Sequence, residues 1–184
     1  MSIIIFLSFT VAFFLIIAAE FYNIIFRGYA PFISTKPGAI EKIVAELNLP
    51  AKAVVYELGC GRAPLLRALS RKYPRADLIG IENEPIPYLI ASIQVNLAKT
   101  NIRIKRKNLF NISLADADAV YCYLNPKMMA ALQKKFQDEC RGGTIIISYQ
   151  FPMPDLKPEK TLEIKGKKEM VYFYRINKNN VGAV

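Results

Sequence analysis

The sequence of 184 residues contains no histidine and no tryptophan. Histidine is the usual general base near neutral pH and the commonest zinc ligand, and it completes the Ser/His/Asp and Cys/His nucleophile arrangements. Its absence excludes these arrangements and indicates chemistry that needs little proton transfer.

Cysteine is also scarce. The three cysteines, Cys60, Cys122 and Cys140, are an odd number without CxxC spacing, so the sequence supports neither a disulfide framework nor a metal knuckle. We expect no metal site, and we expect reduced thiols in a cytosolic compartment.

Acidic residues are outnumbered, with 15 Asp+Glu against 25 Lys+Arg and a formal net charge of +10. With 53% apolar and 22% charged residues, the chain is neither disordered nor collagenous, and its length suits one ordinary domain.

Basic residues gather at 103–107 and 165–168. A solvated face is the default interpretation and attraction to anionic lipid the alternative. Nucleic-acid binding is disfavoured because no aromatic platform accompanies these charges.

Charge is missing altogether from the seventeen residues Ile3 to Ala19, and the apolar run resumes after Glu20 as far as Phe26. A helix rises about 1.5 Å per residue, so one ending at Phe26 would extend about 36 Å and could cross a bilayer. No basic residue precedes the run and no good cleavage site follows it, which disfavours a signal peptide. The sequence predicts one N-terminal transmembrane helix as an uncleaved anchor; a buried terminal core helix is the alternative.

The domain organisation follows from this anchor. We expect a transmembrane segment at residues 1–26 and a folded domain at residues 27–184. The nearby positive charges, Arg27, Lys36 and Lys42, all follow the apolar run. The positive-inside tendency therefore predicts a single-pass membrane protein with its folded domain in the cytoplasm.

The remaining chain alternates short apolar runs with helical periodicity, which predicts an α/β fold with a mostly parallel sheet covered on both faces. The last two strands have no helix between them and predict a closing antiparallel hairpin. We expect strands at 53–58, 77–82, 102–106, 119–124, 143–149, 161–164 and 170–176, and helices at 37–47, 64–73, 86–100 and 128–140.

The most informative stretch is an apolar strand that runs into a glycine turn and then a helix, at residues 54–64. Gly59 and Gly61 let the backbone approach a ligand closely, and the helix that follows offers N–H groups to an anion. Pro64 stands where a dinucleotide fingerprint has its third glycine, which disfavours a nicotinamide cofactor. The Gly-Lys-Ser/Thr ending of a phosphate-binding P-loop is missing.

Further polar residues follow the next two strands. Glu82 ends its strand about twenty residues after the glycines, where a carboxylate accepts both hydroxyls of a ribose. The alternative is that Glu57 and Glu82 are solvated acids at strand ends. After the third strand, the Asn108 amide could read an adenine edge while the apolar Leu109 packs on its face.

These residues resemble the class I, seven-strand S-adenosylmethionine-dependent methyltransferases. The stretch Glu57-Leu58-Gly59-Cys60-Gly61 looks like their first motif, Glu82 like their ribose-binding acid, and Asn108 stands at the place of their adenine-contacting residue. The resemblance implies a Rossmann-like seven-stranded methyltransferase sheet with a terminal antiparallel hairpin, and S-adenosyl-L-methionine as the cofactor.

More narrowly, the chain resembles the membrane-anchored protein-lysine methyltransferases whose mitochondrial members modify the adenine nucleotide translocase and the ATP synthase c-subunit. The matching segments are 29–32, 125–129, 151–154 and 171–174. This resemblance implies transfer of a methyl group to a lysine of a membrane-associated protein. The chain departs from the pattern at residues 62–64, which lack the usual acidic-glycine-arginine continuation, and at Gln150, where an arginine is usual.

The candidate site residues fall into two groups. Those expected to bind the cofactor are Tyr29, Glu57, Gly59, Cys60, Gly61, Glu82, Asn83, Asn108 and Leu109. Those expected at the acceptor are Tyr123 and Asn125, which could orient a neutral amine, and Pro126, which with Asn125 would shape the mouth of the pocket. Simple packing in the sheet is the alternative for Tyr123 and its neighbour Tyr121.

Two other functions stay open. The same fold methylates small molecules and lipids, so a lipid or quinone methyltransferase is the first alternative. The second is a non-catalytic, membrane-tethered scaffold whose glycine turn no longer binds the cofactor.

Overall fold

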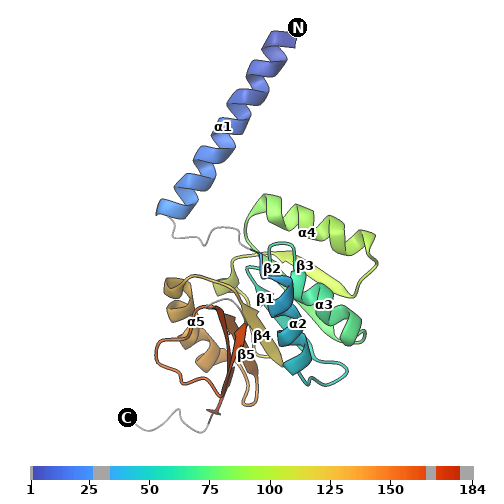
Figure 1. The fold of residues 1–184 in the computed structure, drawn as a ribbon, viewed down its shortest axis with the longest axis vertical. Coiled ribbons are helices and arrows are strands. Elements are labelled where there is room, and N and C mark those ends of the chain that lie inside the picture. The colour runs from blue at the N-terminus through green and yellow to red at the C-terminus, as the bar shows by residue number, and fades with distance from the viewer. Residues whose placement is uncertain (1, 27–33, 165–168, 179–184) are drawn as a thin grey trace. The chain divides into compact units, whose positions relative to one another are not determined.

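The computed structural model describes residues 2–26, 34–164 and 169–178. It separates two compact units, Met1–Ile33 and Ser34–Val184 (Figure 1). The described part of the first unit is one helix, α1 (Ser2–Phe26). The hydroxyls of Ser8 and Thr10 donate to backbone carbonyls one turn earlier in this helix.

The prediction of a single-pass membrane protein is wrong. In the part of the chain that the structure describes, none of the helices combines the length and the apolar character needed to cross a membrane. Glu20 ends the uncharged run from Ile3 after seventeen residues, and a span takes about 20 consecutive apolar residues. The transmembrane helix, and the cytoplasmic orientation deduced from the charges after it, are therefore corrected.

The second unit is built on a seven-stranded mixed sheet, as predicted. Its strands are β1 (Val54–Leu58), β2 (Asp77–Glu82), β3 (Ile102–Arg106), β4 (Ala119–Cys122), β5 (Ile145–Tyr149), β6 (Lys160–Ile164) and β7 (Glu169–Arg175). The order is β3-β2-β1-β4-β5-β7-β6, in which the first five strands are parallel. Strand β7 pairs antiparallel with both β5 and β6, which confirms the terminal hairpin.

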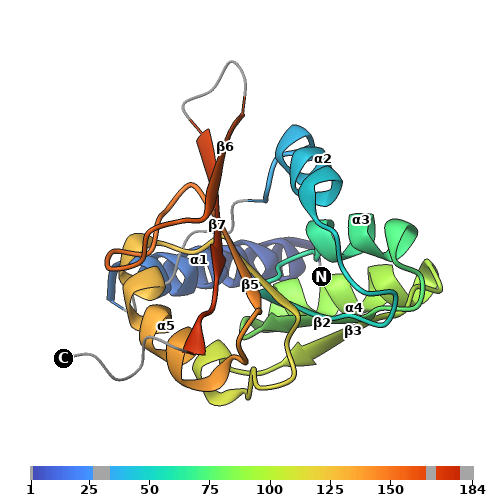
Figure 2. The ribbon, with the colours of Figure 1, turned by 90° about the horizontal axis from the view of Figure 1, so that it is seen from below.

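Four helices cover this sheet: α2 (Pro37–Glu46), α3 (Pro64–Lys72), α4 (Pro85–Leu97) and α5 (Pro126–Glu139). Each begins with proline, whose fixed φ suits the first turn and whose missing N–H costs nothing there. Helices α2, α3 and α4 lie on one face and α5 on the other (Figure 2). A short 3₁₀ turn, η1 (Leu109–Asn111), stands between β3 and β4.

The core consists of two layers, one on each face of the sheet. Alternation along a strand sends Val55 of β1 to the face under α2 and α3, and Leu58 to the face under α5. Both side chains are almost fully buried. Because the central strands are parallel and covered on both sides, their carboxyl ends meet at one edge of the sheet, where ligands of such folds bind.

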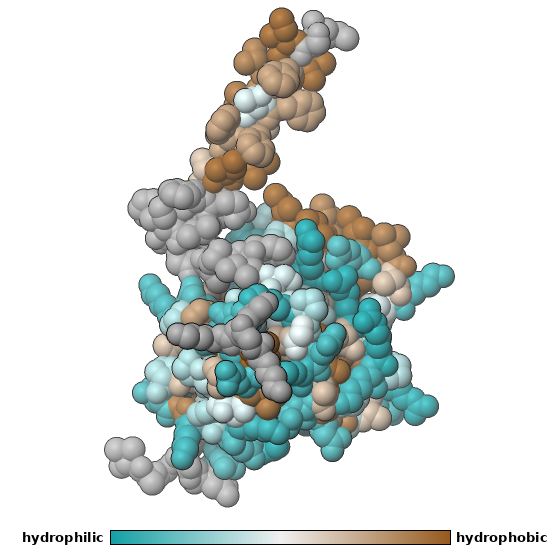
Figure 3. Space-filling view, in the orientation of Figure 1, coloured by the Kyte–Doolittle hydropathy of each residue, from teal (hydrophilic) through white to brown (hydrophobic). Residues whose placement is uncertain are grey.

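One face of α4 carries exposed apolar side chains. Ala91 and Val95 of this helix are buried, whereas a stripe on its outer side is half exposed or more. Figure 3 shows the apolar surface gathered over this helix. The stripe consists of Ile86, Leu89, Ile93 and Leu97.

Candidate active site

The glycine turn after β1 has the backbone that only glycine adopts readily. Gly59 and Gly61 have φ angles of +69° and +52°. A Cβ built on Gly59 would lie 2.9 Å from Cδ2 of Leu124, the side chain that follows β4. The N–H groups of Gly59 and Cys60 both donate to the Ile81 carbonyl, at 2.9 and 3.0 Å. The turn is thus fastened to β2, and a larger residue at its first position would adopt an unfavourable φ and displace the Leu124 side chain.

Glu82 reaches back from β2 to this turn. Its Oε2 accepts the N–H of Gly61 at 2.9 Å, and its Oε1 accepts the N–H of Glu84 at 2.9 Å. The side chain is buried, with 8% of the residue exposed. The alternative of a solvated strand-end acid is therefore wrong for Glu82, because backbone donors hold its carboxylate against the glycine turn.

Glu57 is buried beside the first turn of α3. The Leu66 N–H donates to its Oε2 at 3.2 Å. Burial raises the pKa of this carboxyl to about 8, although the backbone donors of Leu66 and Leu65 and the charge of Arg67 oppose the rise. The N–H groups of Leu65 and Leu66 at the start of α3, which were expected to face a bound anion, therefore donate to the buried Glu57. Glu57 is not a solvated acid either, since 3% of it is exposed.

Cys60 packs under the turn and not toward solvent. Its Sγ would lie 2.7 Å from a Cβ added to Gly80 of β2. Burial, first of all, raises the pKa of its thiol, and the nearby carboxylates of Glu57 and Glu82 act in the same direction. The thiol is therefore protonated, and Cys60 shapes the turn through its backbone.

The residues expected near adenine lie after β2 and β3. The Asn108 Oδ1 accepts the N–H of Phe110 at 3.0 Å and so caps η1. Leu109 is buried in the core layer that holds Ile81. Asn83 is exposed, and its carbonyl accepts from the Arg106 Nε at 3.5 Å.

The predicted acceptor residues follow β4. The Tyr123 ring meets the Tyr149 ring edge-on, with centroids 4.7 Å apart. The Asn125 Oδ1 accepts the Met128 N–H at 2.9 Å, so this side chain caps α5. Pro126 is the first residue of that helix. Tyr29, the remaining predicted contact, lies outside the described residues.

The structure adds residues that the sequence analysis missed. The Tyr149 hydroxyl donates to Oε2 of Glu169, the first residue of β7, at 2.5 Å. Lys36, just before α2, pairs with Oε1 of the same carboxylate. Tyr149 was recognisable as the last residue of an expected strand, but its place beside Tyr123 depends on the order of the strands. No local pattern marks Glu169 or Lys36, which lie 133 positions apart.

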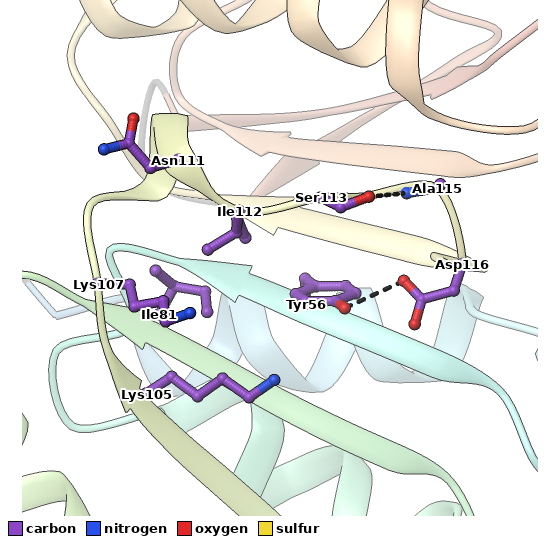
Figure 4. Close-up of a pocket in the computed structure, with 9 residues that line it drawn as sticks. All are labelled: Tyr56, Ile81, Lys105, Lys107, Asn111, Ile112, Ser113, Ala115 and Asp116. Atoms are coloured by element: carbon purple, nitrogen blue, oxygen red, sulfur yellow. Dashed lines mark hydrogen bonds between the residues drawn. The ribbon is translucent and has the colours of Figure 1, made fainter.

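A separate pocket of about 330 Å³ opens on the face of the sheet that carries Tyr56 (Figure 4). The Tyr56 hydroxyl donates to Oδ1 of Asp116 at 3.0 Å, and burial together with this carboxylate raises its pKa to about 12. None of the predicted site residues that the structure describes lines this pocket. Its lining is Tyr56, Ile81, Lys105, Lys107, Asn111, Ile112, Ser113, Ala115 and Asp116.

Comparison with known proteins identifies the family. The ANTKMT methyltransferase domain matches residues 57–160, which include the glycine turn and Glu82. The chain belongs to this methyltransferase family. Like the family, it is an S-adenosylmethionine-dependent enzyme, and the solved structures with a similar fold include methyltransferases bound to S-adenosylhomocysteine.

Two curated relatives have names that specify lysine. A protein-lysine N-methyltransferase of Saccharolobus islandicus is 21% identical over 155 residues, which cover 82% of this chain and 96% of the relative. The adenine nucleotide translocase lysine N-methyltransferase of Mus musculus is 26% identical over 147 residues. These cover 78% of this chain but only 63% of the mouse protein.

The solved structures agree in fold and differ in substrate. An RNA methyltransferase from Salinibacter ruber has a TM-score of 0.73 at 23% identity, covering 78% of this chain and 94% of its own. A precorrin-6y C5,15-methyltransferase from Geobacter metallireducens has a TM-score of 0.62 at 14% identity, covering 79% and 91%. At these identities the likeness establishes the methyltransferase fold alone.

Proposed function

We propose that this enzyme transfers the methyl group of S-adenosylmethionine to the side-chain amine of a lysine in a protein. The observation that carries the proposal is the match to the Saccharolobus islandicus protein-lysine N-methyltransferase, which spans 96% of that relative. Nearly the whole of that enzyme therefore has a counterpart here. We place the catalytic unit within residues 27–184, which contain the family match.

The residues of the glycine turn fit the amino-acid end and the ribose of the cofactor. Gly59 presents only backbone at the first position of the turn, where a Cβ would meet the Leu124 side chain. Glu82 is oriented by two backbone N–H groups, and its carboxylate oxygens have further lone pairs that can accept ribose hydroxyls. We assign the amino-acid end to residues 59–61 and the ribose to Glu82, with Asn83 beside it.

Asn108 and Leu109 are assigned to the adenine ring. The Asn108 oxygen caps η1, which fixes the direction of its amide group. Leu109 contributes an apolar surface at the same edge. Glu57 is assigned to the amino group of the bound cofactor, since a positive charge beside a buried carboxyl favours its ionised form.

The cofactor supplies an activated methyl group on a sulfonium, so the protein has to align a nucleophile and exclude water. A free lysine amine has a pKa near 10.4, so about one in 2,500 is neutral at pH 7. The acceptor must therefore lose one proton before its nitrogen lone pair can form the new N–C bond. The half-buried Tyr123 ring, packed against the buried Tyr149, offers apolar surface that would desolvate the amine and lower its pKa.

Asn125 and Pro126 have a structural task that agrees with a place at the acceptor mouth. The capping bond to Met128 and the proline at the helix start fix the loop after β4. Both oxygens of Asn125 serve α5, since its backbone carbonyl also accepts the Met129 N–H, at 3.0 Å. We therefore propose that Asn125 and Pro126 shape the acceptor mouth and that Tyr123 orients the incoming amine.

The test is to incubate the purified enzyme with radiolabelled S-adenosylmethionine and a cell extract divided into protein, lipid and RNA. We expect label in protein, released by hydrolysis as methyl-lysine, and none with Glu82→Ala. As a matched control, the same proteins with their lysines chemically acetylated beforehand should take up no label, because an amide nitrogen is not nucleophilic. Label in lipid or RNA instead of protein would refute a lysine substrate.

A further inference from the structure

Four side chains form a cluster at the carboxyl edge of the sheet, which we call the carboxylate cluster: Lys36, Tyr123, Tyr149 and Glu169. Tyr123 follows β4, Tyr149 ends β5, and Glu169 begins β7, which pairs with β5. Strand β4 is the neighbour of β1, which carries the glycine turn. With strands about 4.8 Å apart, Tyr149 on β5 lies roughly 10 Å from β1 and Glu169 on β7 roughly 14 Å, so an amine bound at Glu169 has to move toward β1 before methyl transfer.

The donors that hold the carboxylate of Glu169 inside the protein include the Tyr149 hydroxyl and the Lys36 ammonium. Its side chain is 12% exposed, and the Tyr149 hydroxyl and the Lys36 ammonium each contact one of its oxygens. Burial and the hydrogen bond to Glu169 raise the pKa of the Tyr149 hydroxyl, which therefore remains a donor. A carboxylate withdrawn from water in this way needs a cationic partner.

Lys36 shows how a cation can reach this carboxylate from the surface. Its side chain is 45% exposed, whereas its ammonium lies on the buried carboxylate. The stem therefore leads inward from the surface. The lysine of a protein substrate has the same length and the same charged end, so it can follow the same path.

We propose that Glu169 is the receptor for the ammonium of the acceptor lysine, and that Lys36 occupies this receptor until the substrate lysine displaces it. The inference rests on the proposed function and names the group that selects a cationic amine. The rings of Tyr123 and Tyr149 supply the walls, because aromatic faces attract cations. A hydroxyl or another neutral acceptor makes no ion pair with Glu169 and would bind more weakly.

The ion pair acts in binding and not in the transfer step. A carboxylate favours the protonated amine, whereas methyl transfer needs the neutral one. Glu169 is therefore a positioning residue, and its loss should raise KM while kcat changes little. Lys36 competes for the same carboxylate, so its loss should lower KM.

The experiment compares the steady-state kinetics of the parent enzyme and three single variants on a lysine-containing substrate found by the labelling test. We expect Glu169→Gln to raise KM at least tenfold with kcat within threefold of the parent, and Lys36→Met to lower KM at least threefold. Glu159→Gln is the matched control: it removes another carboxylate paired with a cation, Arg175, on the same sheet and should leave KM unchanged. Affinity for S-adenosylhomocysteine should be equal in all of them.

If Glu169→Gln fails to fold because Lys36 loses this ion pair, the double variant Lys36→Met/Glu169→Gln removes both charges of the carboxylate cluster. It is then compared with Lys36→Met alone. Equal KM values for these two proteins would overturn the inference. So would a higher KM in Lys36→Met.

A binding measurement separates this inference from the proposed function. The probe is n-butylammonium, the end of a lysine side chain, titrated into Lys36→Met saturated with S-adenosylhomocysteine and followed by NMR. Binding that disappears with Glu169→Gln supports the receptor even if no protein lysine is methylated. Absence of binding, or binding that is equal in the double variant, overturns it.

Discussion

The protonation of Glu57 can be measured through the stability of the fold. Its pKa is about 8 in the folded protein against an ordinary value of 4.5. Between these two values, unfolding releases a proton, so the free energy of unfolding falls as pH rises. The change is about 1.4 kcal/mol per pH unit, or about 4 kcal/mol between pH 5 and pH 8. The stability that the proton supplies is complete below pH 4.5 and lost above pH 8.

The perturbation is Glu57→Gln, which keeps an oxygen for the Leu66 N–H and cannot titrate. Urea unfolding of both proteins from pH 5 to pH 9 gives their difference in free energy at each pH. We expect the wild type to lose about 4 kcal/mol relative to the variant over this range, most of it below pH 8. Glu159→Gln, at an exposed carboxyl, should stay within about 0.5 kcal/mol of the wild type.

A difference that is constant from pH 5 to pH 8 would refute the buried, protonated acid. The same acid predicts the proton balance of ligand binding. If the amino group of S-adenosylhomocysteine favours the ionised form of Glu57, binding at pH 6 to 7 releases a proton. Calorimetry in buffers with different ionisation enthalpies should detect this release in the wild type and not in Glu57→Gln.

The remaining predictions concern the glycine turn, its acid and the core. Glu82→Gln should raise the calorimetric Kd for S-adenosylhomocysteine at least tenfold, because the amide nitrogen of glutamine cannot accept a hydrogen bond from a ribose hydroxyl. An unchanged Kd would show that Glu82 does not bind the ribose. Gly59→Ala should weaken the same binding and lower the melting temperature, because its φ is +69° and its Cβ meets Leu124. Leu66→Ala, at a fully buried position, should cost about 2 to 5 kcal/mol in urea unfolding, whereas Leu97→Ala, 79% exposed, should cost less than about 1 kcal/mol. Similar costs for the two leucines would contradict the burial of α3 and the exposure of the α4 stripe.

Most of the sheet could be predicted because its strands are short apolar runs that end at glycine, proline or a polar turn. All seven expected strands are present, with boundaries that coincide or differ by one or two residues. The helices were recognisable from their periodicity, and prolines mark their first turns. The order of the strands depends on contacts between distant segments, which a single sequence does not contain.

The candidate site was predictable only where its residues are neighbours in the chain. The glycine turn and Glu82 lie within one β-α-β unit, and the hydrogen bond between Gly61 and Glu82 joins them. Asn125 illustrates a different difficulty, since the same side-chain oxygen can cap a helix or face a substrate, and the sequence pattern is identical. The transmembrane helix was predicted wrongly because the uncharged run at residues 3–19 was joined to the apolar residues after Glu20, and the charge of Glu20 was ignored.

The reactivity of the three cysteines can be used to measure how often parts of the fold open. All three are free and buried, and burial raises the pKa of each thiol. Reagents that react with thiolates can modify these cysteines only when the surrounding structure opens. Cys122, in the centre of the sheet, should therefore label at the rate of global unfolding. Cys60 should label whenever the glycine turn detaches from β2, so the ratio of the two labelling rates records how often the ligand-binding turn opens while the rest of the fold stays intact.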